Sequence, residues 1–479
     1  MGTANQWTAS VADTHDVLVI GAGAAGLTAA GGCAMFGLKV ALIERGAMGG
    51  DCLNTGCVPS KALLAAAARA QEVRTAGRFG ILAGEPRIDF AGVRAHVHGV
   101  IAAIAPKDGR ERFEAMGVEV IAGEARFTGD RALEVNGRRL AAPRVVIATG
   151  SRPVIPDVLA GLPVLTNETI FELEALPARL AIIGGGPVGV EMAQAFRRLG
   201  SAVDLVTSGR LLARDDEDAV RVVREQLQRE GIVIHEHTEL ERAEQVGQDV
   251  VLHLHGGATL AATHVLAAAG RHVDLGALNL AAVGLEAGKD GIAVDANRRT
   301  PAKGVYAIGD CRKGPRFTHA SGRDGAAVVL AIALGWSSKV NGDTLPAVTY
   351  TDPELAQLGP TEAAARSRLG KVEVAVEPFA NDDRAVAEGS TEGFIKTVHA
   401  GRKLVGVTIV GRSAGDLLLP WGLVMAGKAS LFALAQTVVA YPTRSERSKE
   451  VAFRRYEPLI FGKAAKAWAR RLASRRRRR

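Results

Sequence analysis

Residues 16 to 26 read Asp16-Val-Leu-Val-Ile-Gly-Ala-Gly-Ala-Ala-Gly26, and this stretch decides the fold that the sequence predicts. Its start is a mostly apolar run typical of a short buried β-strand, and alanine-rich residues typical of a helix follow its end. Of its glycines, Gly21 makes the turn, Gly23 lets a pyrophosphate come close, and Gly26 lets the helix pack on the strand. Because a helix N-terminus attracts phosphate, the stretch predicts a dinucleotide-binding unit.

A second strand, predicted over Lys39–Ile43, ends at an acidic residue, Glu44. Glu44 lies 23 positions after Gly21, where its carboxylate is placed to accept a hydrogen bond from a ribose hydroxyl. Strand, glycine turn, helix, strand and acid therefore stand in the order that dinucleotide binding needs. A βαβ unit that binds nothing is the alternative interpretation.

The same pattern recurs in a second glycine unit further along the chain. Leu180-Ala-Ile-Ile leads into Gly184-Gly-Gly186-Pro-Val-Gly189, and the next strand is predicted over Ala202–Val206. Position 207, again 23 residues after the first glycine, matches position 44 of the first unit. This internal repeat predicts two dinucleotides in one chain, most simply FAD and a nicotinamide cofactor.

The residue at the matched position differs, and the difference bears on which nicotinamide cofactor binds. Glu44 accepts from a free ribose hydroxyl, whereas Thr207 carries no charge that repels a 2′-phosphate. Arg210 lies just beyond and adds a positive charge. NADPH is therefore favoured over NADH, with a solvated surface role for Arg210 as the alternative.

A third stretch, Gly49-Gly-Asp-Cys-Leu-Asn-Thr-Gly-Cys-Val-Pro-Ser-Lys61, holds two of the four cysteines, Cys52 and Cys57. A chain that turns back over this span can close a small strained disulfide, which is more easily reduced than a structural one. The helix expected to begin here presents a positive N-terminus that favours a thiolate. Structural thiols or metal ligands are the alternatives. The other cysteines, Cys33 and Cys311, are expected to be packed.

The cysteine stretch and the two glycine units together resemble the pyridine nucleotide-disulfide oxidoreductases, the group of dihydrolipoamide dehydrogenase, glutathione reductase and mercuric reductase. The resemblance implies that Cys52 is the interchange thiol and that Cys57 is the thiol on the flavin side. It places Lys61 near the N5 edge of the flavin and pairs this lysine with Glu191. A helix-terminal charge favoured by the helix dipole is the alternative role for Glu191.

The resemblance also implies cofactor contacts in three turns that follow strands. Thr149 and Gly150 lie in the turn where the chain leaves the FAD domain, and Gly270 and Arg271 form a turn that closes the second unit. In the third turn, Asp310 is expected to bond the ribityl or phosphate part of FAD. Without the resemblance, each is an ordinary turn.

The implied fold class is α/β, with two Rossmann-like dinucleotide-binding domains and a C-terminal α+β dimerisation domain. A chain of 479 residues is long enough for about three such domains. The expected parts are an FAD-binding domain in two pieces, an NAD(P)-binding domain, a dimerisation domain and a basic tail: 1–153 with 276–344, 154–275, 345–456 and 457–479. Thr349–Glu354 is expected to open the dimerisation domain, with Gly393–Lys396 and Leu404–Val410 in its central sheet. A homodimer follows from the resemblance.

The sequence departs from the family near its C-terminal end. Members that act on disulfides carry a His-Pro followed by a glutamate, which form an acid/base dyad, whereas this chain has Tyr441-Pro442 and then Glu446. A tyrosine hydroxyl has a pKa of about 10 and is a poor proton shuttle at neutral pH. Mercuric reductases also place a tyrosine in this neighbourhood, but their C-terminal cysteine pair is absent, since no cysteine follows Cys311.

The predicted enzyme is therefore an FAD-dependent NAD(P)H oxidoreductase that passes electrons through flavin to the Cys52–Cys57 disulfide. The predicted acceptor is thiol-reactive, either a soft metal ion or a disulfide. The alternatives are a dihydrolipoamide dehydrogenase-type activity, a flavin-based quinone reductase docked on a membrane, and a non-enzymatic redox sensor or scaffold. No resident metal site is predicted.

The net charge of +8 comes from the C-terminal end, where nine basic and no acidic residues occur from Lys463 onward. The rest of the chain is nearly neutral, which argues against a nucleic-acid-binding domain. The apolar residues among these charges, such as Trp468, fit a basic amphipathic helix on an anionic membrane, but a disordered end is favoured. The polar stretch from Met1 to His15 and the lack of a membrane-length apolar run predict a cytoplasmic location.

Overall fold

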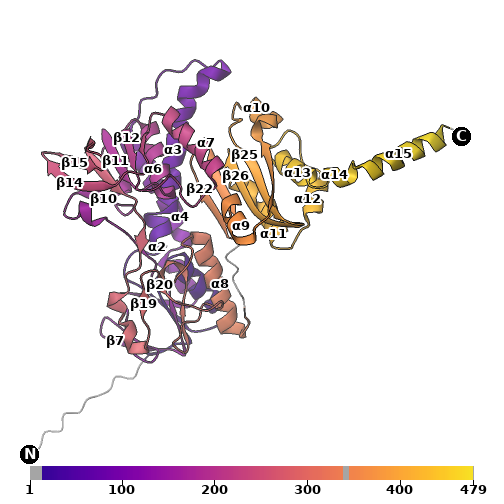
Figure 1. Cartoon of the computed structure of the whole chain (residues 1–479). Helices are drawn as coiled ribbons and strands as arrows, with labels where there is room; N and C mark the ends of the chain where they lie inside the picture. Colours follow the sequence, from indigo (N-terminus) through magenta and orange to yellow (C-terminus); the bar gives the residue numbers. More distant parts are fainter. Residues whose placement is uncertain (1–12, 338–344, 478–479) are drawn as a thin grey trace, which may run out of the picture. The chain divides into compact units, whose positions relative to one another are not determined.

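The computed structural model describes residues 13–337 and 345–477 of the chain (Figure 1). The chain forms two compact units. The first consists of the described parts of Met1–Gly184, Ala195–Ser208 and Thr238–Val340, and the second of those of Gly185–Gln194, Gly209–His237 and Asn341–Arg479.

A parallel five-stranded sheet lies at the centre of the first unit. Its order is β21 (Val305–Ala307), β8 (Arg144–Ile147), β2 (Val17–Ile20), β3 (Val40–Glu44), β4 (Val118–Ala122). A parallel sheet is covered on both faces, so its strands are continuous apolar runs rather than alternating ones. The predicted strands at 16–20 and 39–43 are confirmed, with shifts of at most one residue at either end.

Two layers cover this sheet. Helices α1 (Ala24–Met35) and α8 (Thr318–Leu334) pack on one face, against side chains such as Val19 and Leu42. The other face packs on the sheet β1-β7-β6-β5, whose strands are Asp13–Thr14, Arg138–Ala141, Ala132–Val135 and Arg126–Gly129. Cys33 and Cys311 are fully buried in these two cores, which confirms that they are packed thiols.

The helical region after the first βαβ unit is broken more often than the sequence predicts. Instead of one helix at the cysteine stretch, there are two, α2 (Gly50–Asn54) and α3 (Cys57–Thr75). Gly56 separates them with non-helical angles, φ −125° and ψ −113°, and a side chain there would meet the Asp51 carbonyl oxygen at 2.8 Å. The rest consists of α4 (Phe90–Ile104), α5 (Arg110–Ala115) and the 3-10 turns Ala76–Phe79 and Ala105–Lys107.

The second glycine unit builds a sheet that contains the parallel run β10 (Val164–Leu165), β17 (His264–Ala267), β11 (Arg179–Ile183), β12 (Ala202–Val206). The antiparallel sheet β14 (Leu240–Val246), β15 (Asp249–Leu254), β16 (Thr259–Ala262) shares a core with it. Strand β17 ends at Ala267. Residues Arg271–His272 form a short strand, β18, that pairs with β9 (Arg152–Pro153).

In the second unit, an antiparallel sheet has the order β22 (Pro346–Thr349), β23 (Glu354–Leu358), β26 (Lys403–Gly411), β25 (Phe394–Ala400), β24 (Glu373–Pro378). The two predicted central strands are confirmed as β25 and β26. The stretch Thr349–Glu354, predicted to open this domain, is not one strand, because β22 ends at Thr349, residues 350–353 form a turn and β23 begins at Glu354. Pro353 lies in this turn and lacks the N–H that an internal strand needs.

Helices of the second unit include α6, which begins at Pro187 and runs to Leu199 across the boundary between the units, and α7 (Glu217–Arg229). Around the fully buried Trp421 lie α11 (Leu419–Met425), α12 (Leu431–Gln436) and α13 (Ser445–Arg454). The shorter α9 and α10 span Glu362–Leu369 and Asp383–Ala387.

The C-terminal stretch is helical, so the favoured prediction of a disordered end is wrong. It forms α14 (Glu457–Ile460) and α15 (Lys463–Arg476), and neither helix buries a residue. Alanine, arginine and lysine dominate α15, and all three have high helix propensity. In the part of the chain that the structure describes, no helix has the length and apolar character of a bilayer span.

Candidate functional site

The three glycines of the first turn meet different surroundings. At Gly21, where φ is +101°, an added Cβ would lie 2.4 Å from the Ala148 carbonyl oxygen, and at Gly26 it would lie 1.8 Å from the Gly21 oxygen. At Gly23 the nearest atom is the Gly50 Cα, at 3.9 Å. Gly21 and Gly26 are therefore required by the packing of the chain on itself, whereas Gly23 leaves room for a ligand.

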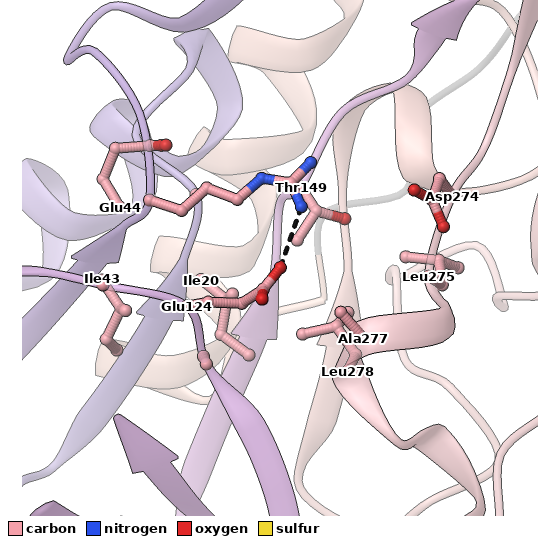
Figure 2. A pocket seen from close by; sticks show the side chains of 13 residues that line it. Ile20, Ile43, Glu44, Glu124, Thr149, Asp274, Leu275, Ala277 and Leu278 are labelled. Atoms are coloured by element: carbon pink, nitrogen blue, oxygen red, sulfur yellow. Dashed lines mark hydrogen bonds and ion pairs between the residues drawn. The ribbon is translucent and has the colours of Figure 1, made fainter. Parts of the chain in front are cut away.

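The end of β3 brings its carboxylate back to this turn. One oxygen of Glu44, Oε2, accepts a hydrogen bond from the Ala22 N–H at 2.6 Å, and Oε1 accepts from the Gly46 N–H at 2.7 Å. Glu44 also lines a pocket together with Gly21 and Thr149 (Figure 2). The fold thus brings three predicted cofactor residues to one cavity from positions far apart in sequence.

The opposite wall of this pocket comes from the segment Asp274–Leu278, as Figure 2 shows. Arg45 reaches across to Glu124, with 3.0 Å between the Nη1 and Oε1 atoms. Apolar side chains of Leu275 and Leu278 face the pocket beside these charged groups. A flat, partly apolar group with polar edges, such as an adenosine, suits such a lining.

The N-terminus of α1 completes a site that fits a dinucleotide. The N-cap residue Gly23 supplies no side-chain cap, and the first turn of α1 carries no acidic residue, so its amides are available to a phosphate. Open space at Gly23, uncapped amides and the Glu44 carboxylate are what a pyrophosphate and a ribose require. The residues present therefore fit FAD.

The two cysteines of the third stretch lie on the two helices that Gly56 separates. Both are free thiols in the structure; Cys57, the first residue of α3, is exposed, and Cys52 is half-buried in α2. The side chains of Cys52 and Cys57 interact, and this interaction favours the thiolate form of Cys57. The Thr318 Oγ1 lies 3.3 Å from the Cys57 sulfur.

These neighbours shift the pKa values of the two cysteines in opposite directions. The hydrogen bond with Cys52, helped by Thr318 and by the positive charge of Lys61, lowers the pKa of Cys57 to about 6, against the opposing effect of the partial desolvation of its sulfur, although the residue as a whole is exposed. The same hydrogen bond, with burial, raises the pKa of Cys52 far above its usual range. At neutral pH the pair therefore holds one thiolate and one thiol, and only a thiolate acts as a nucleophile or soft-metal ligand.

A polar network connects α2 to the turn that carries Asp310. The Arg271 guanidinium donates to the Ser151 Oγ at 2.8 Å, and Ser151 in turn donates to Asp310 Oδ2 at 3.0 Å. Arg271 also lies 3.4 Å from Asp51 Oδ2, and Asn167 donates to Asp51 Oδ1 at 2.8 Å. Burial raises the pKa of Asp310 while Ser151 and Arg271 counteract it. Arg271 thus links the dithiol helix to a predicted FAD residue.

The buried carboxylate of Asp324 accepts a hydrogen bond from the turn that carries Asp310. Asp324, fully buried on α8, accepts from the Arg298 Nε at 2.6 Å and from the Arg312 guanidinium. Its second oxygen accepts from the Gly309 N–H at 3.3 Å. This cluster, like Thr318, Ser151 and Asn167, escaped the prediction from sequence. Thr318 lies 261 positions from Cys57, and no local pattern indicates that the two meet.

The second glycine turn repeats part of this geometry. At Gly184, where φ is +127°, an added Cβ would lie 2.3 Å from the Ala268 carbonyl oxygen, whereas Gly186 has nothing within 4 Å. Gly189 lies in the first turn of α6. Gly150 and Gly270 also have positive φ, +74° and +117°, with open space beside them.

The two residues predicted to choose the nicotinamide cofactor have defined contacts. The backbone carbonyl of Thr207 accepts from the Thr238 N–H at 3.0 Å. Arg210 pairs with Glu217 at 2.7 Å and donates to the carbonyl oxygens of Ala213 and Asp215. Arg210 is therefore held by its own loop while its side chain stays partly exposed, and its role in cofactor choice stays a prediction.

The residues that replace the acid/base dyad, Tyr441 and Glu446, lie in the second compact unit of the fold. The Tyr441 hydroxyl donates to Asp383 Oδ2 at 2.8 Å, and this hydrogen bond raises the pKa of Tyr441. Tyr441 is 72% exposed, and Glu446 lies in the first turn of α13. Tyr441 therefore holds its proton more tightly than an ordinary tyrosine, which makes it a still weaker acid.

The predicted pairing of Lys61 with Glu191 stays a prediction. Glu191 lies on α6, is buried, and accepts from the Tyr350 N–H at 3.0 Å through Oε1. Lys61 lies one helical turn after Cys57 on α3, where its charge favours the thiolate. Within the described residues, no group of three or more His, Cys, Asp and Glu side chains is arranged to hold a metal ion.

Two dinucleotide-type glycine turns and a polarised dithiol define a class of protein, the oxidoreductases that connect a dinucleotide to a pair of sulfurs. Residues 15–325 match the family model described as pyridine nucleotide-disulphide oxidoreductase, and residues 345–452 match the dimerisation domain of the same family. The chain belongs to the pyridine nucleotide-disulphide oxidoreductase family, whose members are FAD-dependent oxidoreductases. Its dimerisation domain indicates a homodimer.

Similar proteins extend along most of the chain. A mercuric reductase from Lysinibacillus sphaericus is 32% identical over 449 residues, covering 92% of this chain and 82% of that protein. A dihydrolipoyl dehydrogenase from Thermus scotoductus is 35% identical over 455 residues, covering 92% and 97%. The similar proteins thus support membership of the family. They carry two different enzyme names, so they do not identify the electron acceptor of this chain.

Solved structures give the same result for the fold. LpdA from Mycobacterium tuberculosis superposes with a TM-score of 0.83 at 27% identity, covering 92% of this chain and 99% of that one. The Cu(II) complex of the HOCl-induced flavoprotein disulfide reductase RclA from Escherichia coli gives a TM-score of 0.81 at 26% identity, covering 91% and 99%. The predicted α/β fold class is confirmed.

Proposed function

We propose that this enzyme uses NADPH to reduce the Cys52–Cys57 disulfide and that the resulting dithiol reduces a soft metal ion. The observation that carries the proposal is the polarised pair itself, in which a low pKa at Cys57 gives a thiolate at neutral pH. FAD, when bound, supplies the two-electron transfer between the nicotinamide and the sulfurs. Gly23, Glu44 and the amides of α1 would hold it.

The roles of the chain's own residues follow from their contacts. Cys57 would stay a thiolate because Cys52 and Thr318 face its sulfur, while Cys52 would meet the acceptor and lose its proton to solvent as it binds the metal ion. When one Hg(II) takes two electrons, or two Cu(II) take one each, the sulfurs form the disulfide. NADPH restores the pair with the two electrons of its hydride, so electrons balance over a cycle.

The contacts of Tyr441 support a metal ion over a disulfide as the acceptor. Reducing a disulfide requires a proton for each leaving thiolate, and a tyrosine whose hydrogen bond to Asp383 raises its pKa is a poor donor. A soft metal ion needs thiolate ligands and no proton. The mercuric reductase names among similar proteins and the Cu(II) complex of RclA support testing Hg(II) and Cu(II).

An NADPH-oxidation screen tests the proposal. Purified holoenzyme would be mixed with Hg(II), Cu(II), lipoamide, glutathione disulfide or a quinone, with NADH in parallel. We expect Hg(II) or Cu(II) to support turnover and lipoamide and glutathione disulfide to support little. Loss of metal reduction in Cys57→Ser, with the FAD spectrum retained, would confirm the role of the dithiol.

The 35% identity to a dihydrolipoyl dehydrogenase favours a second candidate, lipoamide turnover. Faster lipoamide than metal turnover would select it and overturn the choice of acceptor. Quinone reduction that survives a Cys52→Ser, Cys57→Ser double change would show instead that the flavin reduces its acceptor without the sulfurs.

A further inference from the structure

We infer that α15 docks this enzyme on the surface of a membrane that contains anionic lipids. The helix carries six basic residues and no acidic one, and the chain has no acidic residue after Glu457. This surface lies outside the site described above, so the inference is independent of the proposed function.

The side chains of α15 divide into two faces. Ala465, Trp468, Ala469 and Leu472 follow the i, i+3, i+4, i+7 spacing of one helical face. Lys463, Lys466 and Arg470 recur on the opposite side. Trp468 is 60% exposed and Leu472 40% exposed, so this apolar face has no covering layer in the described chain.

The apolar surface continues into the turn before the helix. Leu459 and Phe461 are 78% and 53% exposed, yet the Phe461 ring centroid also lies 6.3 Å from that of Phe453 on α13. This contact joins the start of the tail to the folded domain, and Figure 1 draws α15 beyond α12 and α13. The tail is therefore a helix held at its root, with its faces available along its length.

The combination of faces selects the partner. Six positive charges favour a polyanion, and a second copy of this chain is a weaker candidate because its body carries almost no net charge. Nucleic acid would use the charges but not the exposed tryptophan and leucine. An anionic bilayer uses both, because the apolar face enters the acyl boundary while lysine and arginine remain among the lipid phosphates.

Vesicle co-sedimentation of the full-length holoenzyme tests the inference. We expect binding to phosphatidylcholine vesicles that contain phosphatidylserine and little binding to phosphatidylcholine alone. Replacing Lys466, Arg470 and Arg471 with Gln should weaken binding about 100-fold at about 0.15 M salt. Replacing three exposed lysines of the body, Lys289, Lys303 and Lys371, with Gln removes equal charge and should leave binding unchanged.

A second variant separates lipid from the other occupants. Trp468→Ser with Leu472→Ser should weaken vesicle binding and leave duplex DNA binding, dye reduction by NADPH and the dimer unchanged. The inference fails if the wild type ignores both kinds of vesicle or if the tail and body variants bind alike. It also fails if duplex DNA binds more tightly than vesicles or if the double change dissociates the dimer.

Discussion

The two glycine units of this chain share a backbone arrangement, and one of their side-chain differences lies where a ribose hydroxyl is expected to bind. The Gly21 N–H donates to the Ile43 oxygen at 2.8 Å, and the Gly184 N–H donates to the Val206 oxygen at the same distance. In both units the first glycine has a positive φ and packs against the carbonyl of a later alanine, Ala148 or Ala268. The repeat therefore extends from sequence spacing to individual hydrogen bonds.

The two glycine units differ at matched positions 44 and 207, at the end of the second strand of each unit. Glu44 turns its carboxylate back to the Ala22 N–H, whereas Thr207 brings a neutral hydroxyl side chain to the matched position. The comparison teaches that the shared backbone builds a dinucleotide fold, and we propose that the side chain at the matched position influences which nicotinamide cofactor binds. Four predictions test this division, from the largest expected effect to the smallest.

The largest effect is expected where the backbone of the first unit allows no side chain. Gly26→Ala places a Cβ 1.8 Å from the Gly21 oxygen, so we expect a loss of about 3 kcal/mol in the free energy of unfolding, measured by urea denaturation. The control is Gly186→Ala in the second glycine unit, where an added Cβ would have no atom within 4 Å. This change should alter the free energy of unfolding by less than about 1 kcal/mol. Equal losses in the two variants would contradict the assignment of packing to Gly26.

Placing a glutamate at position 207, as at position 44 of the first glycine unit, is expected to disfavour NADPH relative to NADH. Thr207→Glu puts a negative charge beside the proposed 2′-phosphate site, which should raise the KM for NADPH about 100-fold and leave that for NADH little changed. Thr207→Gln, of similar size and without charge, should keep the preference for NADPH. A wild-type enzyme that prefers NADH would contradict the premise before any variant is made.

The Cys52–Cys57 pair has no counterpart in the second glycine unit. The low pKa of Cys57 depends in part on the hydroxyl of Thr318, which is distant in sequence. Because the pKa of Cys57 is lowered, the thiolate is present above about pH 6 and is lost as the pH falls through that value. Thr318→Val should move the midpoint of iodoacetamide alkylation of the reduced enzyme upward by about one pH unit. Thr318→Ser keeps the hydroxyl and should leave the midpoint in place; an unchanged midpoint in Thr318→Val would remove this residue from the site.

The smallest effect is expected at Arg210. Its guanidinium already pairs with Glu217 and donates to two carbonyl oxygens, so Arg210→Gln should raise the KM for NADPH only about threefold. Glu217→Gln releases the arginine and should not raise this KM. A rise near 100-fold in Arg210→Gln would show that the arginine, rather than Thr207, makes the choice between cofactors.

Much of the fold was predictable because its signals are local. Apolar runs such as Val17–Ile20 identify buried parallel strands, and glycines at positions that allow no Cβ mark the turns after them. Two predictions failed although the features that decide them are also local. The break at Gly56 depends on the Asp51 carbonyl, and the C-terminal charges, expected to favour disorder, lie on an alanine-rich helix.

The sequence alone determined the family, the repeated glycine units and the pair of cysteines, since each is written in residue types at short spacing. Only the tertiary structure decided what surrounds the sulfurs. Thr318 reaches Cys57 from α8, and Arg271 joins Asp51 to the Ser151–Asp310 pair. The physical reason is that a pKa depends on distances through space between charges and hydrogen-bonding groups, and these distances are set by how the sheet, α3 and α8 pack.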